Sequence, residues 1–211
     1  MALPHSRDIF KYPARFQFGQ NPKGPCLGSS CCTDTCIQMV VEYYKDKSFT
    51  LDQVRRQAQG DTRFNEAPCT GINHIEVLNA LEGFGINHYR VGFGSNTSDV
   101  LNYVEIGPVI VGVHYGSYPI RAQAEVGGKT DHGFNGAHAV LAIGKRVHDA
   151  PKDRHRDIFV RDPDHNSPAR PEKPDFDRIR RSQLQRAMEN LPRYTAFSNT
   201  YILYPTRRKS L

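Results

Sequence analysis

The sequence has no run of apolar residues long enough to cross a bilayer. Its start, MALPHSRDIFKYPARF, lacks the apolar stretch of a secretion signal, and no later segment approaches the roughly 18 apolar residues of a membrane span. We therefore expect no membrane partner, no signal peptide and a cytoplasmic location when the protein is made. Repeats and heptads are also missing, so the 211 residues predict a single domain over 1–211.

Cysteine is scarce and unevenly placed. There are five cysteines, an odd number, and four of them fall between Cys26 and Cys36. A chain of this length does not need disulfide staples, and the paired CxxC spacing of structural zinc sites is absent. We expect reduced thiols, no metal and no cofactor, while a zinc or disulfide knot among these four cysteines stays the alternative.

The excess of positive over negative charge is confined to the end of the chain. Residues 1–150 hold 14 Lys and Arg against 14 Asp and Glu, whereas the basic C-terminal part, 151–211, holds 14 against 8 and therefore the whole net charge of +6. Such a surface favours anionic partners, bacterial wall polymers among them, or simply keeps the protein soluble. Nucleic acid ranks last, since no aromatic-interleaved motif accompanies the charge. The same two interpretations apply to four arginines, which either line an anionic subsite or serve solubility: Arg161, Arg170, Arg180 and Arg181.

Helical signals dominate the first 85 residues after an extended segment at 1–31. Apolar residues recur at three and four from Cys32 to Tyr44, which predicts one amphipathic helix. SFTLDQVRRQAQG predicts a second, with a capping box of Thr50 and Gln53 and Gly60 as its end. TGINHIEVLNALEGFG predicts a third, ending at Gly83 or Gly85, with an apolar face made of Ile72, Ile75, Leu78 and Leu81.

The second half of the chain has the composition of strands. Five stretches rich in Val, Ile, Tyr and Phe are bounded by Gly, Pro and Asp: INHYRVGF, GPVIVGVHYG, GAHAVLAIGKRVH, DIFVRDP and TAFSNTYILYP. Short helices are expected at 97–105 and 181–191, the latter with Ser182 as N-cap, and residues 164–178 are expected to form a surface loop. Helices first and strands later predict an α+β fold with a largely antiparallel sheet.

The stretch GSSCCTDTCIQMVVEYY places thiols where the first helix begins. A helix start offers unpaired N–H groups and the positive end of the helix dipole, so a thiolate there is stabilised and its pKa falls. This position favours a nucleophile. We prefer Cys32 because the helix starts directly behind it, and Cys26 and Cys31 are the alternatives.

A thiolate nucleophile needs a base and a group that orients the base. His138 opens the predicted strand AHAVLAIG after a glycine-rich loop, where it either serves as that base or bonds the backbone. Asp162 ends the following strand before a proline, where it either orients the histidine or initiates a turn. The cysteine, the histidine and the aspartate follow one another in this order along the chain, so the functional interpretation of each supports that of the other two.

These segments resemble a known family. CCTDTCIQMVVEYY is similar to the CGPxCLAMVLxYY block of the papain-like cysteine peptidases that process bacteriocin leaders, the C39-like type, and GPVIVGVHYG, GAHAVLAIG and FVRDPD are similar to the strands that follow it. Aligning Met39 with the methionine of that block puts the nucleophile at Cys32, and the strands put the base at His138 and the orienting acid at Asp162. Thr33 and Asp34 stand where the family has Gly-Pro.

The resemblance implies a papain-like fold and acyl transfer through a Cys/His/Asp triad, with Gln20 as the oxyanion donor. Gln20 lies twelve residues before Cys32 but six before Cys26, the family's usual spacing, so Cys26 stays open as nucleophile. The expected substrate is a peptide, isopeptide or peptidoglycan-like cell-wall amide bond. Family members also occur in bacteriophage particles, which makes virion association with other phage structural proteins an expectation. The alternative function is a non-enzymatic assembly module that retains the fold.

Overall fold

The computed structural model describes residues 32–66, 72–118, 137–146, 157–163, 177–191 and 200–209, with the side chains of 61–66 and 177 left out. Its first half contains α1 (Cys32–Lys45), α2 (Leu51–Glu66), α3 (His74–Gly83), β1 (Tyr89–Phe93), α4 (Thr97–Tyr103), β2 (Val109–His114) and the short 3-10 helix η3 (Tyr115–Ser117). Its second half contains β3 (Ala137–Arg146), β4 (Asp157–Arg161), β5 (Asp177–Arg180), α6 (Arg181–Asn190) and β6 (Tyr201–Pro205).

The strands form one six-stranded sheet in the order β1-β6-β2-β3-β4-β5. Each neighbouring pair is antiparallel, which confirms the α+β class and the antiparallel sheet expected from the sequence. Five of the strands coincide with the five predicted stretches. The sixth, β5, was not predicted, and it corrects the loop expected over 164–178, whose last two residues begin this strand.

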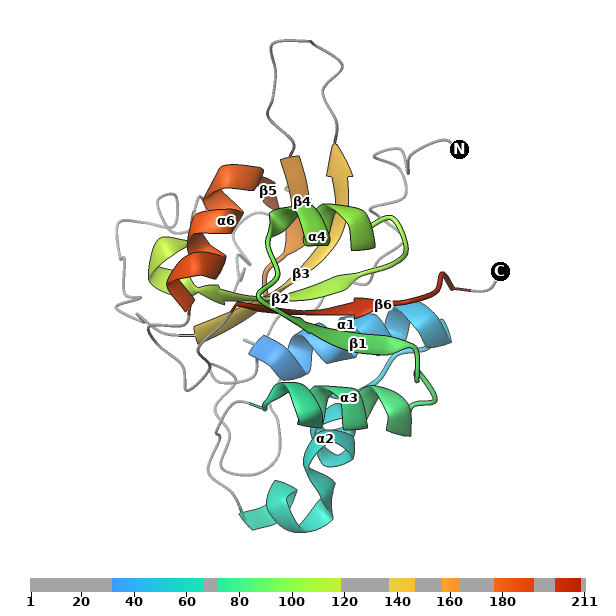
Figure 1. Cartoon of the computed structure of the whole chain (residues 1–211). Helices are drawn as coiled ribbons and strands as arrows, with labels where there is room; N and C mark the ends of the chain where they lie inside the picture. Colours follow the sequence, from blue (N-terminus) through green and yellow to red (C-terminus); the bar gives the residue numbers. More distant parts are fainter. Residues whose placement is uncertain are drawn as a thin grey trace, which may run out of the picture.

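Helices cover both faces of the sheet, α1, α2 and α3 on one side and α4 and α6 on the other (Figure 1). Successive side chains of a strand point to opposite faces of the sheet, so each face has its own hydrophobic core. Along β3, Ala139, Leu141 and Ile143 pack with the first three helices, whereas Val140 and Ala142 pack with α4 and α6. Because β3 is buried on both faces, its sequence from Ala139 to Ile143 is continuously apolar.

Local signals set most helix boundaries. The predicted capping box of α2 is present, since Gln53 N donates to Thr50 Oγ1 at 3.2 Å and Thr50 N donates to Gln53 Oε1 at 2.8 Å. Gly60 does break the helix, with φ 73° and ψ 163°, but helical structure resumes beyond it to Glu66. The expected end at Gly60 is therefore a kink.

Two helix predictions were wrong in detail. Ile75 is 58% exposed, because the buried face of α3 is instead formed by Glu76, Val77, Ala80 and Leu81. Ser182 is not the N-cap of α6. The helix begins at Arg181, and its N-cap is Arg180. Arg180 N donates there to Gln183 Oε1 at 3.1 Å.

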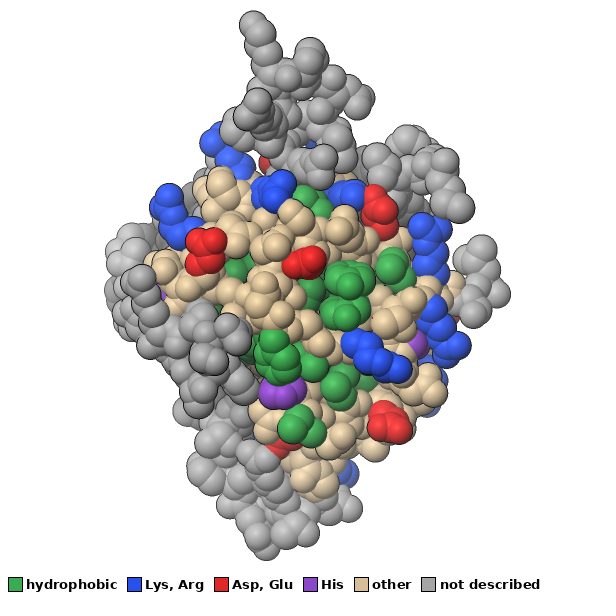
Figure 2. All heavy atoms as spheres, viewed as in Figure 1, with side chains coloured by type: hydrophobic (Ala, Val, Ile, Leu, Met, Phe, Trp, Pro, Cys, Tyr) green, Lys and Arg blue, Asp and Glu red, His purple; other side chains and the backbone are tan. Residues whose placement is uncertain are grey.

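The face drawn in Figure 2 carries apolar side chains near its centre and several Lys and Arg side chains toward its upper edge, over α6 and α4. Helix α4 contacts β6 through the stacked rings of Tyr103 and Tyr204, whose centroids lie 3.8 Å apart. None of the helices in the described part of the chain combines the length and apolar character needed to cross a membrane.

Candidate active site

Three of the side chains singled out in the sequence meet where α1 approaches the sheet. Cys32 is the first residue of α1, His138 is the second residue of β3, and Asp162 directly follows β4. Helix α1 packs on β3, and the buried Cys36 Sγ donates to the Ala139 carbonyl at 3.6 Å, one helical turn beyond Cys32. This contact secures the start of α1 beside the start of β3.

The histidine and the aspartate form a close buried pair. His138 Nε2 lies 2.7 Å from Asp162 Oδ1, and the side chains are only 4% and 7% exposed. The contact is possible because β3 and β4 are adjacent, with Leu141 opposite Arg161. Since Nε2 is occupied by the carboxylate, Nδ1 is the ring nitrogen left for the Cys32 side chain.

Electrostatics at the thiol favour its charged form. Burial by itself raises the pKa of Cys32, but the charge of His138, a hydrogen bond with that imidazole, the Ala139 backbone and the Thr33 hydroxyl together hold the pKa below its ordinary value. The Thr33 Oγ1 atom lies 3.9 Å from Cys32 Sγ. These influences make the thiol at the helix start easier to ionise than an ordinary cysteine.

The pKa of the His138 imidazole shifts in the opposite direction to that of the thiol. Burial lowers the pKa of His138, but the charges of Asp162 and Cys32 and hydrogen bonds to both outweigh burial, and the pKa is raised well above its usual range. Each of the two shifts favours the charged form of its group, as is expected where a thiol and an imidazole interact closely. Of the three residues only Cys32 is partly exposed.

The second thiol of α1 differs sharply from the first. Burial, together with the negative charges of Cys32, Asp162 and Asp34, raises the pKa of Cys36 well above the ordinary value. Cys36 is fully buried. One helical turn thus holds two thiols in different environments, Cys32 with a lowered pKa and Cys36 with a raised one.

Two tyrosines border the site, and sequence reasoning did not find them. The Tyr115 ring meets the His138 imidazole edge-on, with centroids 4.7 Å apart, and Tyr115 is 4% exposed. Burial and the nearby thiols Cys32 and Cys36 raise the pKa of Tyr201. Tyr115 directly follows β2 and Tyr201 begins β6, but only the tertiary structure shows that these positions adjoin Cys32 and His138.

The turn that carries Tyr115 is tied to α6. Ser117 Oγ lies 2.7 Å from His114 Nδ1 and accepts from Asn190 Nδ2 at 2.8 Å. The backbone N–H of Tyr118 donates to the Tyr115 carbonyl at 3.0 Å and closes the turn. These contacts hold η3, and with it the Tyr115 ring, against the imidazole.

A buried carboxyl group lies in the first turn of α1. Asp34 is 3% exposed, and its Oδ1 has no hydrogen-bond partner among the described residues. Burial raises the pKa of Asp34 to about 7, although the buried Arg55 acts in the opposite direction. Asp34 therefore changes its charge within the neutral range, two residues from the thiol.

Three further sequence candidates, Gln20, Cys26 and Cys31, lie outside the described residues. Of the four arginines named as a candidate anionic subsite, Arg161 is buried at the end of β4 and Arg170 is outside the described part of the chain. Arg180 and Arg181 are neighbours at the start of α6. Among the described residues, Arg180 and Arg181 are the two of this set that lie next to each other.

No protein-family profile matches the chain, and no curated protein sequence is similar to it. Among solved structures it is similar to a C39-like peptidase from Bacillus anthracis, with a TM-score of 0.57 and 14% identity over 94% of this chain and 96% of that one. It also aligns with the peptidase domain of Streptococcus ComA, a bifunctional ABC transporter of a quorum-sensing pathway, with a TM-score of 0.46 and 14% identity over 86% and 96% of the two chains.

The first of these alignments spans almost the whole of both chains. The protein therefore has the papain-like fold of the C39-like cysteine peptidases, as the sequence resemblance implied. At 14% identity the likeness establishes the fold and not the activity.

Proposed function

We propose that the protein is a thiol hydrolase that cleaves a peptide, isopeptide or cell-wall amide bond, with Cys32 as nucleophile, His138 as general base and acid, and Asp162 as the orienting carboxylate. The observation that carries the proposal is the 2.7 Å contact between His138 Nε2 and Asp162 Oδ1 beside a partly exposed thiol. The opposite pKa shifts of Cys32 and His138 support it, because they describe a thiolate that exists before substrate arrives.

In the proposed reaction the Cys32 thiolate attacks the carbonyl carbon of the scissile amide. The Cys32 backbone N–H at the start of α1 stabilises the resulting oxyanion, with Gln20 as the second donor implied by the resemblance. The His138 imidazolium then donates its proton to the leaving amine, the C–N bond breaks, and a thioester remains on Cys32.

Water completes the cycle. Neutral His138 takes a proton from a water molecule, whose oxygen attacks the thioester carbonyl, and collapse of the intermediate releases the carboxylic acid and restores the ion pair. Throughout, Asp162 holds Nε2 of the ring, so that Nδ1 stays directed at the sulfur. Association with a phage particle and the wall-derived substrate remain predictions from the sequence.

An acylation burst tests the mechanism without knowledge of the substrate. p-Nitrophenyl acetate should release about one equivalent of p-nitrophenolate per protein, and peptide mapping should place the acetyl group on Cys32. Cys32→Ala should abolish the burst, whereas the matched variant Cys36→Ser, on the same helix, should retain it.

Three results would contradict the proposal in different ways. A burst that persists in Cys32→Ala excludes Cys32 as nucleophile, and an acetyl group on Cys26 or Cys31 transfers the role to that residue. If no cysteine is acetylated, the thiol does not perform acyl transfer, and the protein is better described as a non-enzymatic assembly module with a papain-like fold.

A further inference from the structure

A single hydrogen bond restrains the His138 imidazole only in part. Asp162 holds the ring at Nε2, with 2.7 Å between the two atoms. The torsion that turns a histidine ring about its Cβ–Cγ bond has a broad minimum, so the ring can turn with little change at its far end. Such a turn displaces Nδ1, the nitrogen that faces Cys32 in the proposed reaction. Displacement of a reacting group by about 1 Å can slow catalysis on the order of a hundredfold, so the imidazole needs a second restraint.

The ring of Tyr115 supplies a contact of the required kind. Its centroid lies 4.7 Å from that of the His138 ring, and the two planes are inclined at 64°. Aromatic rings favour this edge contact. Because Tyr115 is buried, its ring obstructs rotation of the imidazole and helps to keep water away from the hydrogen bond to Asp162.

The register of two strands brings the rings together. β2 and β3 are antiparallel, with Val113 opposite His138, and Tyr115 follows two residues after Val113. Residues at this diagonal position of an antiparallel pair are within reach of aromatic side chains. The contact between the two rings therefore follows from how β2 pairs with β3, and a change in that register would abolish it.

The turn that carries Tyr115 is fastened to a helix. Asn190 Nδ2 donates to Ser117 Oγ at 2.8 Å, and the same oxygen lies 2.7 Å from His114 Nδ1. Asn190 is the last residue of α6. The helix itself is fixed to the sheet by fully buried side chains in the core on that face: Leu184, Ala187 and Met188. The place of the Tyr115 ring thus depends on α6.

We propose that Tyr115 is a positioning residue that holds the His138 imidazole for proton transfer to the leaving group, and that α6 keeps Tyr115 in place through Asn190. This inference rests on the proposed function, since it concerns the general acid of that reaction. When an ester acylates Cys32, the imidazolium proton passes from Nδ1 to the leaving oxygen as the C–O bond breaks and the thioester forms. A misaligned ring still stabilises the thiolate by its charge, but it transfers the proton poorly.

Two esters with different leaving groups test the positioning of the proton donor. p-Nitrophenolate leaves readily without a proton, whereas phenolate is the stronger base and gains more from protonation. Tyr115→Leu should therefore slow the acylation burst with phenyl acetate about tenfold and that with p-nitrophenyl acetate less than about twofold. Tyr115→Phe retains the ring and should behave as the wild type. A mere loss of folded protein would instead lower the amplitudes of both bursts equally.

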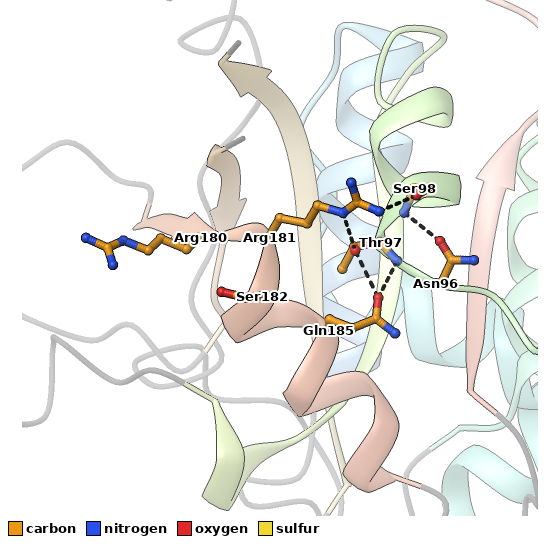
Figure 3. Close-up of a pocket in the computed structure, with 7 residues that line it drawn as sticks. All are labelled: Asn96, Thr97, Ser98, Arg180, Arg181, Ser182 and Gln185. Carbon is orange, nitrogen blue, oxygen red and sulfur yellow. Dashed lines mark hydrogen bonds between the residues drawn. The ribbon is translucent and has the colours of Figure 1, made fainter. Parts of the chain in front are cut away.

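Asn190→Ala tests the role of α6, and Gln185→Ala, on the same helix, is its matched control. Gln185 Oε1 accepts from the N–H and the hydroxyl of Thr97 at 2.9 Å, so its side chain is directed to the start of α4 and not to the Ser117 turn (Figure 3). Asn190→Ala should slow the phenyl acetate burst about threefold, the effect of one lost hydrogen bond. Gln185→Ala should leave both bursts unchanged, and equal effects of the two variants would overturn the role of α6.

Proton NMR of the imidazole supplies a readout that needs no turnover. A carboxylate only accepts hydrogen bonds, so Nε2 carries the proton between His138 and Asp162. In protein with isotopically labelled histidine, the signal of this proton is identified by its absence from His138→Gln. It should exchange with water at least about tenfold faster in Tyr115→Leu than in the wild type or Tyr115→Phe.

Three results would each overturn the proposal: equal slowing of the two esters in Tyr115→Leu, equal impairment of Tyr115→Phe and Tyr115→Leu, or unchanged proton exchange in Tyr115→Leu. A wild type that neither ester acylates would instead contradict the hydrolase proposal. Proton exchange would then decide by itself whether Tyr115 orients the imidazole.

Discussion

Replacement of His138 by Gln is the most direct test of the coupling between the imidazole and the Cys32 thiol. Burial raises the pKa of the wild-type thiol, and the charge and hydrogen bond of His138, with the Ala139 backbone and the Thr33 hydroxyl, outweigh it. Without the imidazole, only Ala139 and Thr33 oppose burial, so the pKa should rise to the ordinary value or above. At pH 6 a thiol with an ordinary pKa of about 8.5 is roughly 0.3% ionised, so the variant would lose nearly all its thiolate at that pH.

The rate effect is smaller than the loss of thiolate. A thiolate of lower pKa is intrinsically less nucleophilic, with a Brønsted coefficient of about 0.4–0.5, so the rate changes roughly as the square root of the ionised fraction. We therefore expect His138→Gln to be alkylated at least about tenfold more slowly at pH 6. The difference should shrink as the pH rises, because both proteins then become fully ionised.

Brief iodoacetamide labelling between pH 5 and 9, followed by peptide mapping, measures this profile residue by residue. Cys36 provides an internal reference, since it is fully buried and its pKa is raised. His88→Gln is the matched control, because it replaces another buried histidine, at the start of β1, that packs against Tyr44 rather than the thiol. Identical Cys32 profiles in wild type and His138→Gln would show that the residues are uncoupled, and the catalytic interpretation would fail.

Four further outcomes are expected. Asp162→Asn should reduce turnover of an acylating ester far more than it slows Cys32 labelling, since the thiolate can persist while the imidazole loses its orientation; equal losses in the two assays would contradict this. Asp34→Asn should raise the free energy of unfolding at pH 8 by about 1–3 kcal/mol and have little effect at pH 4, measured by urea titration. The sign follows because the folded pKa of about 7 lies above the unfolded value of 3.8, so stability is present below about pH 4 and is lost as the pH rises through 7. Gly112→Ala should lower the melting temperature through a loss of about 1–3 kcal/mol, because the added carbon would lie 2.7 Å from the Tyr201 ring; an unchanged melting curve would refute that packing. Chelator should leave the melting temperature and the Cys32 labelling rate unaltered, whereas stoichiometric zinc whose removal unfolds the protein would restore the metal-knot alternative.

Periodic and capping patterns determined much of the secondary structure from the sequence alone. The start of α1 at Cys32, the Thr50–Gln53 capping box of α2 and five of the six strands follow from interactions between residues close in the chain. Such local interactions are the same whatever the rest of the chain does, so a single sequence reveals them. The sequence also singled out Cys32, His138 and Asp162, which the structure places close to one another.

Several features depend on tertiary packing and were therefore missed or misassigned. β5 is a short strand recognisable only by its pairing with β4, and Ile75 is exposed because α3 turns Val77 and Ala80 toward the core. Local propensity predicts neither the pairing of β5 nor the exposure of Ile75, because both depend on which surface a neighbouring element covers.

The chemistry of the site belongs wholly to the tertiary structure. His138 and Asp162 are 24 residues apart and meet only because β3 and β4 pair, and the charges and hydrogen bonds among Cys32, His138 and Asp162, which outweigh burial, move the pKa values of the thiol and the imidazole. The contact between α4 and α6 has the same origin, since Arg181 donates to Ser98 across 83 residues of sequence. The sequence determined which side chains were available, and long-range packing decided which of them share a low-dielectric site where charge interactions are strong enough to tune chemistry.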